Sequence, residues 1–366
     1  MKRRDFLKNA GIILAGTAVA KLPAVSMAAP AVQVKKEVSV GIFAPSHCSA
    51  PVIYASVKDF FKNAGIKVNL VNYPQQPELL ADVVSGKLYA GQSIAPLVMT
   101  THLGASAVPK SSLVVPMIMG VHGSNLMIST TSNISKPQGF KGKRVASPSK
   151  LSIHYLLTRL FLEKNGMDLE KDTLFSVVKL KELPLFLKEG KIDAFMYPEP
   201  TTAMAEDTGK AFTYVLNKFI WKYHPCCCLA MKRDVFEKDR EMSKAFVSSV
   251  ARASLTINRE DNRKELATLL RTTPYGFAEI PSPVLEIAFA NDRSDFQPFP
   301  YQSSAVFILN LLKKYKLIPE INSKQVAHEV FLSDFMRECF SDMGVKPPKS
   351  NFRYETVMGE VLNLET

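Results

Sequence analysis

The chain has few cysteines, little sign of membrane-spanning sequence and no strongly basic segment, and each absence excludes a class of protein. Its five cysteines are odd in number and three are consecutive, so they do not form the paired framework of a small disulfide-rich domain. No apolar run reaches the ~20 residues that a membrane-spanning helix needs. The net charge is +12, but residues 1–29 carry five basic residues and one acidic residue, which leaves +8 for the rest. That excess is spread thinly without interleaved aromatics, so a nucleic-acid partner is not expected.

Common catalytic motifs are also absent. There is no phosphate-binding P-loop and no G-x-S-x-G nucleophile turn, and His328-Glu329 lacks the second histidine of a zinc-protease helix. Hydrophobic residues make up 46% of the chain and charged residues 22%, which is typical of a globular protein. A chain of 366 residues is long enough for two lobes with separate cores. We therefore expect a globular protein that is not an enzyme.

The first 29 residues have the layout of an export signal. Arg3 and Arg4 precede a bulky apolar pair, an apolar stretch runs over 10–20, and small residues follow at 26–29. This order predicts a twin-arginine signal peptide over 1–29, cleaved after Ala28 or Ala29. The alternative is a membrane anchor, for which eleven apolar residues are too few. Because the twin-arginine route carries folded proteins, we expect a periplasmic or otherwise extracytoplasmic domain.

The rest of the chain alternates between strand and helix periods. This pattern predicts an α/β protein of two lobes, each a mostly parallel sheet flanked by helices. Lobe I would begin with residues 36–123, lobe II would span 124–225, and residues 226–366 would complete lobe I and add C-terminal helices. Hinge crossings are expected near residues 120–125 and 223–229. A ligand cleft would lie between the lobes, beside strand ends and helix N-termini.

Several loops carry candidate ligand contacts. The loop after the first strand contains Ser46, His47 and Cys48, and helix capping explains neither the histidine nor the cysteine. We expect one of those two side chains to contact a ligand. Ser93 precedes the next helix and offers a hydroxyl.

His154 lies near the start of a strongly amphipathic helix, off its apolar stripe. It would therefore face either solvent or the cleft, and a surface position is the more common outcome. In an extended crossing, Cys226 and Cys228 would share one face and Cys227 would take the other. These cysteines could equally be small buried core residues.

The order of several short motifs resembles a known family. Phe140 to Ala146, Ser152 to Tyr155, Gly190 to Phe195, Glu199-Pro200 and Trp221 to Pro225 occur together, in this order, in solute-binding proteins of ABC importers. The match is to the nitrate, bicarbonate and sulfonate (NitT/TauT-type) branch. It implies the type II periplasmic-binding-protein fold, and it covers most of the chain after the signal.

The resemblance also assigns roles to residues. It implies that His154 contacts an anion and that Glu199 lies in the cleft, and it draws attention to Ser124 and Asn125 after the first crossing. The nitrate binders of the family have a tryptophan near the end of the second strand, where this chain has Tyr73-Pro74-Gln75. The resemblance thus predicts a monomeric receptor that passes a small anionic or polar solute to an importer permease and ATPase.

A rival interpretation rests on the cysteines. The triple cysteine resembles part of the cysteine-rich stretch of iron-binding pyrimidine synthases in thiamine biosynthesis, although Leu229-Ala230 follows it here. No cofactor is needed for a receptor. In the rival interpretation, a soft transition metal ion would be held by soft ligands, namely His47, Cys48, His224, Cys226 and Cys228.

Overall fold

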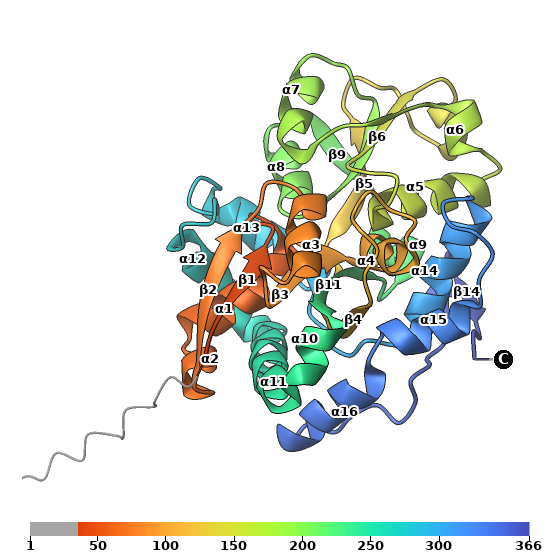
Figure 1. Cartoon of the computed structure of the whole chain (residues 1–366). Coiled ribbons are helices and arrows are strands. Elements are labelled where there is room, and N and C mark those ends of the chain that lie inside the picture. Colours follow the sequence, from red (N-terminus) through yellow and green to blue (C-terminus); the bar gives the residue numbers. More distant parts are fainter. Residues whose placement is uncertain (1–35, 366) are drawn as a thin grey trace, which may run out of the picture. The chain divides into compact units, whose positions relative to one another are not determined.

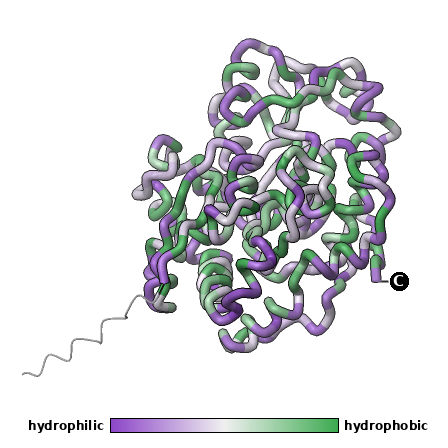
Figure 2. The backbone as a smooth tube through the Cα atoms, in the orientation of Figure 1, coloured by the Kyte–Doolittle hydropathy of each residue, from purple (hydrophilic) through white to green (hydrophobic). Residues whose placement is uncertain are grey.

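The computed structural model describes residues 36–365, which form two mixed sheets with helices packed against them and a small three-stranded sheet (Figure 1). The expected signal peptide lies outside the described residues. Hydrophobic and hydrophilic residues alternate in short stretches along the described chain (Figure 2). None of the helices in this part is both long and apolar enough to cross a membrane.

The larger sheet has six strands in the order β12-β4-β11-β3-β1-β2. Their bounds are β1 (Lys36–Ile42), β2 (Ile66–Asn72), β3 (Ala90–Ile94), β4 (Leu113–His122), β11 (Pro225–Lys232) and β12 (Ser294–Asp295). Strand β4 is buried along its whole length, because side chains from both of its faces enter hydrophobic cores. Val115 and Ile118 pack into one core, and Met117 and Met119 pack into the other.

Helices cover both faces of this sheet. One core contains α1 (Ala50–Val57), α11 (Arg240–Ile257), α12 (Arg263–Arg271), α13 (Ser282–Ala288) and α16 (Ser333–Asp342). The other contains α3 (Gln76–Ser85), α4 (Ala95–Leu103), α14 (Gln302–Lys314) and α15 (Ser323–Val330). Smaller helices are α2 (Phe60–Asn63) and α10 (Arg233–Lys238), with single turns η1 (His47–Ser49) and η4 (Glu260–Asn262). Gly86 and Gly104 end α3 and α4 with φ of 82° and 77°, as their sequence positions predict.

The second sheet has five strands in the order β7-β6-β8-β5-β9. Their bounds are β5 (Ser124–Ser129), β6 (Arg144–Ser147), β7 (Leu174–Val177), β8 (Ala194–Pro198) and β9 (Ala211–Leu216). Its helices are α5 (Ile153–Lys164), α6 (Leu169–Asp172), α7 (Leu183–Lys188), α8 (Thr201–Asp207) and α9 (Asn217–Ile220), with single turns η2 (Pro137–Phe140) and η3 (Leu180–Glu182). The third sheet joins β10 (Trp221–Lys222) to the hairpin of β13 (Glu355–Val357) and β14 (Glu360–Leu362).

The strand pairing adds detail to the expected mostly parallel sheets: most strands of each sheet point the same way, but one strand of opposite direction is inserted among them. Of the neighbouring strand pairs, β1–β2, β1–β3, β6–β7 and β6–β8 are therefore the parallel ones. Strand β11 inserts between β3 and β4 and runs antiparallel to both. Strand β5 likewise runs antiparallel to β8 and β9. Strand β5 follows β4 directly from the other sheet, and β11 follows β10 of the small sheet, so neither strand is reached through the helical crossover that joins parallel neighbours. The lobe boundaries themselves stay a prediction.

Candidate ligand cavity and its His–Cys cluster

A cavity of about 440 Å³ is lined by residues from both sheets. From the six-stranded sheet and its loops come Phe43, Ser46, Cys48, Gln92, Ile94, Cys226 and Cys227, together with residues 74–77 and Leu97. From the five-stranded sheet and its loops come residues 148–150, Ser152, His154, Val177, Lys179, Leu180 and Pro198. Most of this wall is apolar or carries thiols, and a few polar groups are placed within it. Such a composition is typical of a small-molecule site.

His154 contributes an unpartnered imidazole to this wall. Its helix, α5, begins where the Ser152 hydroxyl accepts a hydrogen bond from the backbone N–H of Tyr155 at 3.2 Å. This start places His154 in the first turn, where its side chain is only 4% exposed. Neither ring nitrogen has a hydrogen-bond partner among the described residues. His154 therefore faces the cavity, and the surface position is excluded.

The His154 ring is uncharged at neutral pH. Burial, together with smaller contributions from the nearby His224 and His47, lowers its pKa to about 3. A neutral imidazole carries one donor nitrogen and one acceptor nitrogen. His154 can thus both donate a hydrogen bond to a solute and accept one from it.

Ser46 and Gln92 form a fixed polar corner of the cavity. The Gln92 side chain accepts from the backbone N–H of Phe43 at 3.1 Å and donates to the Ser46 hydroxyl at 3.0 Å. The Ser46 hydroxyl in turn donates to the Phe43 carbonyl at 2.6 Å. Gln92 was not among the predicted site residues, although its place next to Ser93 before α4 could have indicated it. Because side chains alternate along β3, Gln92 faces the cavity and Ser93 does not line it.

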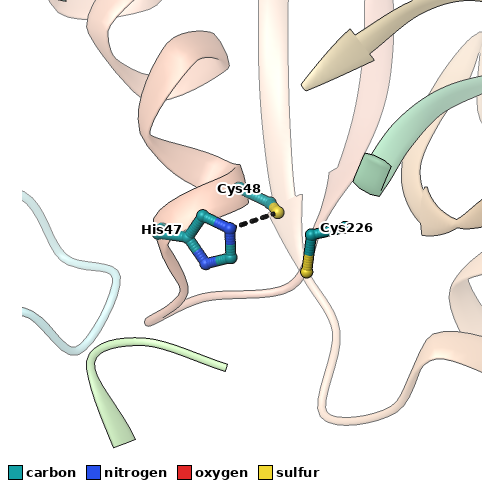
Figure 3. Close-up of side chains that lie close together, drawn as sticks. All are labelled: His47, Cys48 and Cys226. Atoms are coloured by element: carbon teal, nitrogen blue, oxygen red, sulfur yellow. Dashed lines mark hydrogen bonds between the residues drawn. The ribbon is translucent and has the colours of Figure 1, made fainter. Parts of the chain in front are cut away.

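A compact group of soft ligand atoms lies beside this corner. His47 Nε2 is 3.1 Å from Cys48 Sγ, and both atoms lie within 4.8 Å of Cys226 Sγ (Figure 3). All three side chains are fully buried. We call these three residues the His–Cys site. The η1 turn and strand β11 therefore bring the Cys48 and Cys226 thiols close together.

The arrangement of the three consecutive cysteines differs from the expected alternation. Irregular pairing between β11 and β4 shifts the register on both sides of Cys227. Cys226 and Cys227 consequently both line the cavity, while Cys228 does not. The His–Cys site also omits His224, whose Nδ1 lies 3.1 Å from the Trp221 carbonyl oxygen. Of the five metal-ligand candidates, the structure brings together His47, Cys48 and Cys226.

A second buried polar cluster involves Glu199, which is fully buried. Its Oε1 accepts from Arg293 Nε at 2.6 Å and from Asn125 Nδ2 at 2.8 Å, and its Oε2 accepts from the Ala203 N–H at 3.0 Å. Arg293 also donates to Glu206 at 2.6 Å. We call Glu199, Arg293, Asn125, Thr202 and Glu206 the ion-pair network. Burial raises the pKa of Glu199, and the Arg293 charge opposes that rise.

Comparison with known proteins assigns the chain to a family. A family model described as NMT1-like matches residues 32–271. The chain belongs to the NMT1-like family. Its described part has the two-sheet fold of the periplasmic binding proteins in the nitrate, sulfonate and bicarbonate branch, which confirms the fold and the family predicted from the motif order.

Individual relatives are distant. The nitrate/nitrite binding protein NrtA of Synechococcus elongatus is 23% identical over 84% of this chain and 78% of its own length. The bicarbonate transport ATP-binding protein CmpC of the same organism is 24% identical over 72% of this chain, which spans only 41% of CmpC. The crystal structure of the periplasmic nitrate-binding protein NrtA from Synechocystis PCC 6803 superposes with a TM-score of 0.79, at 18% identity, over 88% of this chain and 94% of that one.

Not every predicted site residue lines the cavity. Ser46, Cys48 and His154 do so, and His47 lies beside Cys48. Ser124 instead accepts a hydrogen bond from Asn217 Nδ2 at 2.6 Å. Asn125 and Glu199 belong to the ion-pair network. In addition to Gln92, the cavity-lining residues absent from the prediction include Phe43, Ser149, Ser152, Lys179 and Cys227.

Proposed function

We propose that this chain is an extracytoplasmic receptor that captures a small solute in the cavity and delivers it to an ABC importer. Membership of the NMT1-like family supports this function, as does a cavity built from both sheets. The names of its relatives, which bind nitrate or belong to bicarbonate transport, are consistent with it. The observation that carries the proposal is His154, a buried and unpartnered imidazole in the cavity wall.

The wall chemistry favours a polar or anionic solute. His154, Ser46 and Gln92 provide hydrogen-bonding groups and Lys179 supplies positive charge, while the Lys150 ammonium is paired with Glu170 at 2.9 Å. Polar groups at fixed positions within an apolar wall confer orientation and specificity. Capture requires only alignment of donors and acceptors, so the proposed function includes no chemical step.

The crossings between the sheets would act as hinges in this proposal. The β4–β5 crossing passes through Gly123, whose φ is 66°, and the return crossing enters β11 at Pro225. Closure around a solute would bring the Ser46 side of the cavity towards the His154 side. The receptor would act as a monomer with the importer permease and ATPase as its partners.

A thermal-shift screen of the mature protein tests the function. The screen would include nitrate, bicarbonate, alkanesulfonates and uncharged polar solutes. A true ligand at a hundred times its dissociation constant stabilises the protein by ~2.7 kcal/mol. His154→Ala should reduce this shift, and His328→Ala, in α15, is the matched control. Equal shifts for wild type and His154→Ala would place binding outside the cavity.

The export route is proposed from the paired arginines and has its own test. Arg3→Lys with Arg4→Lys should leave the precursor in the cytoplasm, because the export receptor reads the paired guanidinium groups. Cell fractionation and immunoblotting would measure this. Normal periplasmic accumulation of the doubly substituted precursor would rule out the twin-arginine route.

A further inference from the structure

We propose that the His–Cys site binds a single Cu(I) ion through His47 Nε2, Cys48 Sγ and Cys226 Sγ. This inference concerns a metal ion and does not depend on which solute the cavity captures. It rests on the donor set, on the backbone packed around it, on access from the cavity and on the free imidazole opposite.

The three donors have the chemistry and spacing of a soft metal site. Thiolate sulfur is a preferred ligand of Cu(I), Zn(II) and iron–sulfur clusters, and imidazole nitrogen suits copper and zinc as well. The donor atoms lie within 4.8 Å of one another, which lets one ion contact all three after small side-chain rotations. Structural zinc sites almost always have four protein ligands, and catalytic zinc sites have three with an open position. Cys227, beside Cys226 on the cavity wall, is a further thiol close to the three donors. We choose Cu(I), which accepts three ligands, and a parallel titration with Zn(II) tests this choice.

The backbone around the donors leaves no room for larger residues. A Cβ atom at Gly120 would lie 2.6 Å from Cys48 Sγ, and one at Gly123 would lie 2.0 Å from His47 Nε2. Gly123 also has a φ of 66°, which disfavours any other residue there. Both glycines lie at the end of β4, so the sheet itself positions His47 and Cys48. The pairing irregularity in β11 then places Cys226 opposite them.

The site adjoins the cavity. Cys48 and Cys226 belong to the cavity wall but are fully buried, so an ion in the cavity would reach them after local side-chain movement. No carboxylate of the ion-pair network lines the cavity, because Glu199 is held by Arg293. Hard cations, which need oxygen ligands, are thus disfavoured.

A further observation points to a ligand at this position. His154 lines the same cavity with both ring nitrogens unpartnered and only 4% of its surface exposed. Unsatisfied polar groups in the interior are rare in native proteins. A metal-bound ligand such as water or a solute could accept a hydrogen bond from this ring. On binding, the two thiols release their protons to solvent and the sulfurs coordinate as thiolates, while the oxidation state of copper does not change.

Anaerobic Cu(I) titration of the reduced mature protein tests the inference. Competition with bicinchoninate should give one equivalent bound by the wild type. Cys226→Ser should weaken affinity at least tenfold, or ~1.4 kcal/mol. Cys339→Ser is the matched control, because Cys339 is an equally buried free thiol in α16, within the other core. Circular dichroism melting of each variant would check that it folds.

The outcomes separate the alternatives. Equal Cu(I) affinity in the wild type and in Cys226→Ser would overturn the site, as would a larger loss in Cys339→Ser. Loss on Cys227→Ser but not on Cys226→Ser would overturn the assigned ligands. Tighter binding of Zn(II) than Cu(I) in parallel titrations would overturn the choice of metal.

A Cys48–Cys226 disulfide, found by thiol counting in the protein purified without reductant, would replace metal binding with thiol oxidation. None of these results depends on the solute screen, so the two proposals fail separately.

Discussion

Two buried polar clusters adjoin where the chain crosses between the sheets, and they differ in how fully their polar atoms are satisfied. In the ion-pair network, both oxygens of Glu199 accept hydrogen bonds and Arg293 donates to two carboxylates. On the cavity side, His154 has no partner on either nitrogen, and Nδ1 of His47 has none among the described residues. A hydrogen bond of 3.0 Å from the backbone N–H of His47 to the backbone carbonyl of Glu199 joins the two clusters.

This difference separates a structural role from a binding role. An unsatisfied buried polar group costs about 1–3 kcal/mol, so several of them together are expensive unless a ligand completes them. In the ion-pair network, other groups of the protein already satisfy the hydrogen-bonding atoms of Glu199 and Arg293. It holds Asn125 of β5 and Glu199 beyond β8 against Arg293, which precedes β12 of the other sheet. We infer that the network stabilises the crossing and that the cavity side receives the ligand.

The largest expected effect comes from breaking the network. Arg293→Met removes the charge opposite Glu199 and leaves a fully buried carboxyl with fewer donors. Breaking a buried pair from one side typically costs 3–5 kcal/mol, so we expect a loss of roughly that size. Urea unfolding of the mature protein would measure it.

The double variant Arg293→Met with Glu199→Gln is the control for this prediction. It removes the unpaired buried carboxyl of Glu199 as well as the guanidinium of Arg293, so it should be more stable than Arg293→Met alone. A single-variant loss below about 1 kcal/mol would mean that the network does not stabilise the crossing.

Acid should destabilise the cavity side. The pKa of His154 is lowered by burial to about 3 in the folded protein, against about 6.5 in the unfolded chain. Below pH 6.5 the unfolded chain therefore binds more protons, so stability is present above pH 6.5 and is lost as pH falls towards 3. The loss from this one histidine should be on the order of 2 kcal/mol at pH 5.

Urea unfolding at pH 7.5 and at pH 5 would measure this loss. His154→Asn removes the titrating ring and should flatten that part of the pH dependence. His328→Asn, in α15 and outside this cavity, is the control substitution. An identical pH dependence in wild type and His154→Asn would mean that His154 is protonated without penalty.

Removing the His154 ring should weaken solute binding more than it weakens the fold. His154→Ala should lower affinity at least tenfold, or ~1.4 kcal/mol, because the free imidazole contacts the cavity. Calorimetry with the solute found by the screen would measure it. His102→Ala is a suitable control, since His102 lies in α4 and does not line this cavity. Unchanged affinity in His154→Ala would contradict the ligand role.

Local patterns predicted much of this molecule. The apolar stripe of α5 identified His154 as a candidate, because this residue lies near the start of the helix and off the stripe. Such patterns depend only on residues that are close in the sequence, so they can be predicted from the sequence alone.

Contacts between residues far apart in the sequence could not be predicted in this way. Glu199 pairs with Arg293, 94 residues away, so its burial in a network could not be distinguished from a place on the cavity wall. The register shift at Cys227 depends on how β11 fits beside β4, and simple alternation assigned Cys228 to the wrong face. The mixed sheets have the same origin, because β11 enters its sheet from a distant part of the chain.

The smallest effect should come from an arginine pair that resembles the network but lies near the surface. Arg144 donates to both oxygens of Asp193 at 2.7 and 2.8 Å, but the Arg144 side chain is 43% exposed. In Arg144→Met, the backbone N–H of residue 144 can still donate to Asp193, as it does now at 2.8 Å. The carboxylate would also gain water, so we expect a loss below about 1 kcal/mol. Urea unfolding beside Arg293→Met would compare the two pairs directly. A loss as large as that of Arg293→Met would show that burial does not explain the difference between them.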